Sequence, residues 1–147
     1  MQRIWNLTTL FVVLRFLLAV VFIYASIDKI LHPADFAAIV KDYKVLPDIL
    51  INLTAIILPW LELVLGVLLV LGRWQEGTLL LVNLLLVAFW ATLVFNYFRG
   101  VDVGCGCFST QATESSNMVW YMVRDGFFVL VGGTTAILFL RTPNRVI

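Results

Sequence analysis

Residues 7–31 read LTTLFVVLRFLLAVVFIYASIDKIL, an apolar stretch that contains one charged side chain, Arg15, before it reaches Asp28 and Lys29. A helix needs about 20 mainly apolar residues to cross the roughly 30 Å of hydrocarbon in a bilayer. Three further stretches meet that length, at residues 49–71, 78–98 and 118–140. The stretch at residues 7–31 is longer than the core of a secretory signal, and no small-x-small cleavage site follows it. We therefore expect it to be a permanent helix. The predicted fold class is therefore all-α, an integral membrane four-helix bundle.

The composition of the chain supports this fold class. Of 147 residues, 62% are hydrophobic and 13% are charged, whereas a soluble domain averages roughly 25% charged residues. Ten basic residues against nine acidic ones give a formal net charge of +1, so no strong field attracts nucleic acid. At this length we expect a single domain over residues 1–147, with the lipid bilayer as its surroundings.

The connections between the spans differ in length and character. In residues 33–46 apolar side chains recur at helical spacing, and prolines at positions 33 and 47 suit a helix start and stop. We expect a short amphipathic helix there on the membrane surface, with its polar residues toward water: Asp35, Lys41, Asp42 and Lys44. Residues 72–77 form a tight turn, and residues 99–117 form the long loop that contains both cysteines.

The orientation in the membrane does not follow from the basic residues alone. Four spans place both chain ends and the 72–77 turn on one side, and the 33–46 helix and the 99–117 loop on the other. The basic residues at the two faces divide evenly: Arg3, Arg73, Arg141 and Arg145 against Lys29, Lys41, Lys44 and Arg99. Disulfide chemistry works best outside the reducing cytoplasm, so we expect cytoplasmic ends and a periplasmic or extracellular cysteine loop.

Two charged residues lie well inside the predicted spans. Arg15 is about eight residues into the first span and Glu62 about ten residues from the same face of the second, which places both roughly 12–15 Å deep. A charge near the bilayer centre costs at least ~2.5 kcal/mol, so two residues at one depth are expected to pair. The Arg15–Glu62 pair would either fix the helix register or serve in proton or ligand binding.

A second group of charges lies near the cysteine side of the membrane. Arg124 and Asp125 are about six to eight residues inside the last span, and Asp28 and Lys29 end the first span near the same face. The Arg124 guanidinium could stabilise a thiolate or bind a quinone carbonyl, or it could pair with Asp28 or Asp125. Two deep aromatic residues, Trp60 and Trp90, could flank a quinone ring together with Arg124, or simply pack between helices.

The cysteine loop is the segment whose residues best suit chemistry. Residues 102–109 read DVGCGCFS, so glycines flank and separate Cys105 and Cys107 and permit unusual backbone dihedrals. A disulfide between them would close a strained ring and exchange readily with other thiols. The alternatives are two free thiols in a glycine-rich turn, or a soft metal shared with another subunit. The chain by itself completes no four-ligand metal site, and we expect no metal.

Several short motifs resemble a known membrane family. The segments 15–19 (RFLLA), 29–33 (KILHP) and 59–63 (PWLEL), with Phe36, Tyr43, Leu46, Pro47 and Gly66, look like the DoxX-like family. The Cys105-Gly106-Cys107-Phe108 turn and the later Arg124-Asp125 pair resemble its MauE branch. The resemblance extends from Arg15 to about Phe128, with Ser at positions 26 and 109 where the family commonly has Gly.

The resemblance implies a bacterial inner-membrane protein associated with thioredoxin-like extracytoplasmic proteins. Such a protein would support the formation or reduction of disulfides in secreted proteins. The leading hypothesis is thus a thiol-disulfide oxidoreductase in which Cys105 and Cys107 exchange electrons with a partner, with quinone as a candidate electron acceptor. The alternative is a non-catalytic subunit that anchors or assembles a larger respiratory or transport complex.

Overall fold

The computed structural model describes residues 2–100 and 118–141, and within them every regular element is a helix. The elements in chain order are α1 (Gln2–Leu31), α2 (Pro33–Asp42), α3 (Asp48–Leu71), α4 (Gln75–Phe98) and α5 (Met118–Arg141). Four of them contain segments long and apolar enough to cross a membrane, at Leu7–Leu31, Asp48–Leu71, Gln75–Phe98 and Val119–Arg141. The four predicted spans are therefore confirmed, and the protein is a multi-pass membrane protein.

The helix ends follow from local backbone geometry. Helix α3 ends at Leu71 because Gly72 adopts a left-handed conformation with φ of 68°, which a residue with a Cβ rarely adopts. Trp74 is also left-handed, with φ of 50°, and α4 begins directly after it at Gln75. The turn between the two spans is consequently shorter than the sequence indicates, and α4 starts three residues before the predicted position 78.

The short helix between the first two spans is present, but it packs on protein. Helix α2 ends at Asp42 and not near residue 46, because Lys44 is left-handed with φ of 49°. Its polar residues are exposed as expected. Its apolar side is buried: Phe36 and Val40 cluster with residues of α3, and Ile39 and Tyr43 cluster with Leu93 of α4 and two residues of α5. The expected short amphipathic helix is therefore present, with its polar residues exposed and its apolar side packed on neighbouring helices.

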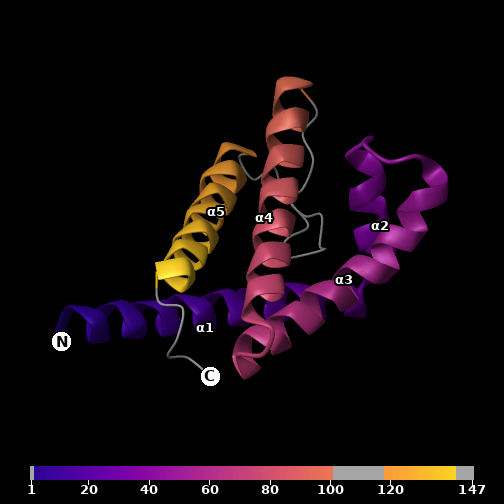
Figure 1. Ribbon diagram of the computed structural model, residues 1–147. Coiled ribbons are helices and arrows are strands. Elements are labelled where there is room, and N and C mark those ends of the chain that lie inside the picture. The colour runs from indigo at the N-terminus through magenta and orange to yellow at the C-terminus, as the bar shows by residue number, and fades with distance from the viewer. Residues whose placement is uncertain (1, 101–117, 142–147) are drawn as a thin grey trace.

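The spanning helices associate mainly as two pairs. Helix α1 packs most extensively on α3 and α4 on α5, and Figure 1 shows α1 crossing below the upright α4–α5 pair. The main core cluster joins all four helices and includes Phe11, Leu18, Leu65, Val82 and Leu138. Large apolar side chains on the outer faces remain exposed, for example Val20, Leu84 and Leu130. Such faces are stable only when hydrocarbon surrounds them.

Helices α1 and α3 approach each other closely at Gly66. A Cβ added there would lie 2.7 Å from Cγ1 of Ile23 and 3.3 Å from the backbone oxygen of Ala19. Small residues at helix crossings in membranes allow backbones to approach in this way. Gly66 therefore sets the distance between the two helices and also their register.

We predict that Gly66→Ala destabilises the fold by about 1–3 kcal/mol, because the added methyl forces α1 and α3 apart. The matched control is Gly133→Ala in α5, where an added Cβ meets nothing within 4 Å. Thermal unfolding of the purified protein in detergent measures both. Equal melting temperatures for the two variants would show that Gly66 is not a close-packing position.

Candidate functional site

The centre of the candidate site is an ion pair between α1 and α3. Lys29 Nζ donates hydrogen bonds to both carboxylate oxygens of Glu62, at 2.8 Å each. The two residues are 1% and 3% exposed, so neither charge reaches the surroundings. The ammonium also lies over the rings of Phe36 and Phe89, 5.1 and 4.9 Å from their centroids. These contacts offset the cost of removing two charges from water, which is several kcal/mol per ion.

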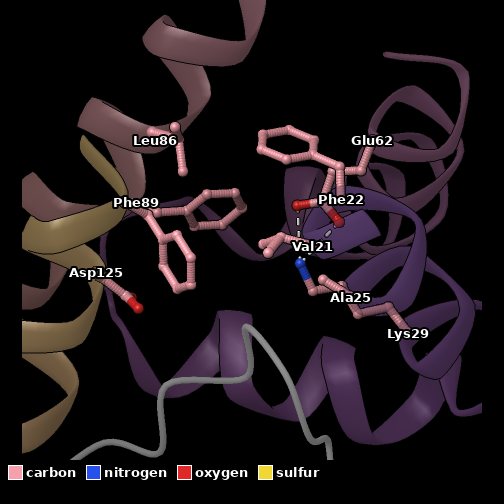
Figure 2. Close-up of a pocket in the computed structure, with 9 residues that line it drawn as sticks. Val21, Phe22, Ala25, Lys29, Glu62, Leu86, Phe89 and Asp125 are labelled. Atoms are coloured by element: carbon pink, nitrogen blue, oxygen red, sulfur yellow. Dashed lines mark hydrogen bonds and ion pairs between the residues drawn. The ribbon is translucent and has the colours of Figure 1, made fainter. Parts of the chain in front are cut away.

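A small cavity connects this pair with the last helix. Lys29, Glu62 and Asp125 line it together with aromatic and aliphatic side chains of α1, α4 and α5. Figure 2 shows the Asp125 carboxylate on the opposite side of the cavity from the Lys29–Glu62 pair. The cavity volume is about 40 Å³, which is enough for a water molecule or two but far below the roughly 300 Å³ of an ordinary ligand pocket.

The second ion pair belongs to α5. Nε and one terminal nitrogen of Arg124 both lie 2.9 Å from Oδ1 of Asp125. The guanidinium also lies over the ring of Tyr121, at 5.1 Å from its centroid. Asp125 is one of the two partners considered for Arg124. Lys29, Arg124 and Asp125 thus gather at one end of the molecule as expected, while Asp28 precedes Lys29 on α1 and does not line the cavity.

The expected Arg15–Glu62 pair is not formed, because Glu62 is bound to Lys29. Helices α1 and α3 are antiparallel, and Gly72 lies beside Arg15. A Cβ added at Gly72 would be 2.9 Å from a guanidinium nitrogen of Arg15. Glu62 is ten residues before Gly72 on α3, a separation of roughly 15 Å along the helix. Equal depth does not give this pairing because the apolar segments of the two helices are offset: Gly72, directly after α3, lies beside Arg15 and not beside Leu7, where the apolar segment of α1 begins.

A signal for the correct pairing is present in the sequence. Gly66 on α3 contacts Ala19 and lies close to Ile23 on α1. Small residues recur on this stretch of α1, and Ser26 is fully buried one turn before Lys29. Aligning the small residues of the two helices, rather than their depths, places Glu62 next to the Ser26–Lys29 turn.

Of the three residues considered for a quinone site, Trp90 lines the groove between α4 and α5. Trp90 donates its indole N–H to the backbone oxygen of Met122, at 3.1 Å. It lines an open groove of about 720 Å³ between α4 and α5. Trp60 is 55% exposed on α3 and does not line that groove, and neither does Arg124. A quinone site formed by Trp60, Trp90 and Arg124 therefore stays a prediction.

Cys105 and Cys107 lie outside the described residues, but both ends of their loop are described. Helix α4 ends at Phe98, and α5 begins at Met118. Tyr97 in the last turn of α4 and Val119 in the first turn of α5 line the same groove. Arg124 lies six residues after Met118, the first residue of α5, which is roughly 9 Å along the helix.

We predict that Lys29→Met and Glu62→Gln each destabilise the protein by about 3–5 kcal/mol, because each change leaves an uncompensated buried charge or polar group. The double variant should recover most of this loss. The exposed His32–Asp35 contact of α2, 4.0 Å long, provides the control, and Asp35→Asn should change stability by less than ~1 kcal/mol. Thermal unfolding of all four variants tests this, and additive losses in the double variant would contradict it.

Comparison with known proteins agrees with the architecture. The family model for methylamine utilisation protein MauE matches residues 7–140. The MauE protein of Paracoccus denitrificans is 34% identical over 96 residues, which cover 65% of this chain and 52% of the relative. The MauE protein of Methylorubrum extorquens is 34% identical over 100 residues, which cover 67% and 53%. That of Methylophilus methylotrophus is 26% identical over 125 residues, which cover 84% and 66%.

The chain spans about half the length of the first two of these relatives. No solved structure matches it. The family model nevertheless covers all four membrane-spanning segments and the loop between α4 and α5. On this match, the chain belongs to the MauE family.

Proposed function

We propose that this chain is a membrane thiol-disulfide oxidoreductase that supports methylamine utilisation. The observation that carries the proposal is the Cys105-Gly106-Cys107 sequence in a loop whose two ends are held together by the packed α4 and α5 helices. The partner is a thioredoxin-like protein outside the cytoplasm. The chain then lies in the bacterial inner membrane with cytoplasmic ends and a periplasmic loop, where disulfides persist.

The exchange needs no reactant besides the two proteins. A thiolate of the partner attacks one sulfur of the Cys105–Cys107 disulfide, forms an intermolecular disulfide and releases the other cysteine as a thiolate. The second thiolate of the partner then attacks its own sulfur in this mixed disulfide. The partner leaves oxidised, and this chain keeps two electrons as a pair of thiols. The reverse sequence reduces the partner, and we assign no step to a quinone.

The charges below the loop support this chemistry. Asp125 is 6% exposed and holds the Arg124 guanidinium through two nitrogens. We assign Arg124 the role of stabilising the thiolate released during exchange, since a guanidinium forms strong hydrogen bonds with anions. Asp125 is then a positioning residue, and it also joins α5 to the Lys29–Glu62 cavity.

The second candidate function is a non-catalytic subunit that anchors or assembles a larger membrane complex. The Lys29–Glu62 pair favours it, because this pair joins two helices in a closely packed region and the space beside it is about 40 Å³. In that function the buried charges specify helix packing, and the cysteines take no part.

We predict that a single-cysteine variant traps the partner. In Cys105→Ser or Cys107→Ser the remaining thiolate can attack the disulfide of an oxidised thioredoxin-like protein. The neighbouring cysteine that resolves this mixed disulfide in the reverse sequence is absent, so the conjugate should accumulate in one of the two variants. Non-reducing electrophoresis followed by mass spectrometry detects the conjugate, which a reductant should remove. The double Cys→Ser variant is the control. If no conjugate forms in either single variant, the exchange mechanism is wrong.

The two candidate functions also predict different effects on growth with methylamine. For the oxidoreductase, Cys105→Ala and Cys107→Ala abolish growth while the protein accumulates in the membrane at the normal level. For the subunit, both cysteine variants grow normally, whereas Glu62→Ala prevents the complex from accumulating. Growth curves and immunoblots of membrane fractions distinguish these outcomes.

A further inference from the structure

Arg15 is a buried cation that the thiol-disulfide chemistry does not use. The residue is 8% exposed, and its guanidinium lies over the rings of Phe11 and Phe16, 6.0 and 5.2 Å from their centroids. No carboxylate pairs with it among the described residues, and its buried Nε has no hydrogen-bond acceptor there. Burying a guanidinium that lacks an anionic partner costs several kcal/mol of desolvation free energy, and a bound anion would offset this cost.

The guanidinium lies beside the turn that joins the α3 and α4 spans. It is next to Gly72, where an added Cβ would be 2.9 Å from one of its nitrogens. Gly72 belongs to the turn between α3 and α4, in which Arg73 is exposed and Trp74 is 83% exposed. Exposed tryptophans and arginines at the ends of spans mark the headgroup region of the bilayer. Arg15 thus faces the depth at which lipid phosphates lie.

The start of α4 adds a second feature that favours an anion. Helix α4 is 24 residues long and has no side-chain hydrogen bond at its N-cap. The first backbone N–H groups of a helix lack intrahelical acceptors, and the helix dipole places partial positive charge there. The amide of Gln75 is held in place by its hydrogen bond to the backbone oxygen of Gly72, 3.0 Å long. Glu76 is the carboxylate in this first turn, and it is exposed.

We propose that Arg15 and the first turn of α4 bind the phosphate group of an anionic phospholipid. The buried, unpaired guanidinium supplies the charge, and the turn supplies further donors and the exposed Arg73. The apolar surface beside the site favours a lipid over free phosphate. Phe16, Leu71 and Leu80 are 42%, 63% and 68% exposed and offer contact to acyl chains. This site is independent of the cysteine chemistry and lies at the opposite end of α4 from the cysteine loop.

The test compares bilayers that differ only in headgroup charge. The full chain is reconstituted in nanodiscs of phosphatidylcholine alone and of phosphatidylcholine with phosphatidylglycerol. We expect phosphatidylglycerol to raise the melting temperature by about 3 °C, because a ligand that binds only the folded state stabilises it. Native mass spectrometry after detergent extraction should show retained phosphatidylglycerol. An equal shift from inorganic phosphate added to phosphatidylcholine discs would overturn the lipid proposal.

Three variants locate the site. Arg15→Gln should weaken phosphatidylglycerol retention about tenfold, the effect of losing one charge-assisted contact. Arg15→Lys keeps the charge but loses the forked geometry, so it should fold and retain several-fold less of this lipid. Arg141→Gln is the control, because it removes one exposed positive charge from the last turn of α5 and leaves Arg15 in place. If both Arg15 variants retain phosphatidylglycerol as well as Arg141→Gln does, the proposal is wrong.

Discussion

The arrangement of the helices depends on the hydrogen-bonded ion pair between Lys29 and Glu62. Two charges inside a membrane protein are stable only when each satisfies the other, so α1 and α3 must cross where the ammonium reaches the carboxylate. Gly66 permits the close approach that this requires. Helix α2 then contributes Phe36 over the ammonium, and α5 contributes Asp125 to the adjoining cavity. The pair therefore determines which residues of the other helices can reach the polar centre.

Hydropathy and proline positions predict most of the fold. The four spans and the helix that starts at Pro33 follow from local sequence, because bilayer thickness and backbone chemistry act on each segment separately. The apolar side of α2 could not be assigned to protein rather than lipid from the sequence, because both surroundings favour the same residues. Its early end depends on the left-handed backbone at Lys44, which the polar sequence there does not indicate.

The candidate site was predicted in part. Sequence position placed Lys29, Arg124 and Asp125 near one membrane face, and the structure brings them together. Sequence position does not identify the partner of Glu62, because the register of two apolar helices depends on where their small residues meet and not on depth. Trp60 is exposed on α3, whereas Trp90 donates a hydrogen bond from α4 to the backbone of Met122 on α5. The cysteines remain the residues whose chemistry was clearest from sequence, and the MauE family match covers their loop.

The position of the ion pair in the chain has a consequence for biogenesis. Lys29 and Glu62 both belong to the first half of the sequence, so both are synthesised before α4 and α5 exist. Because chains emerge from the ribosome N-terminus first, α1 and α3 can neutralise each other during insertion, and neither charge then enters the lipid alone. Leu86, Phe89 and Asp125 arrive afterwards and cover the pair. The order of synthesis is thus also the order in which the polar centre is paired and then enclosed.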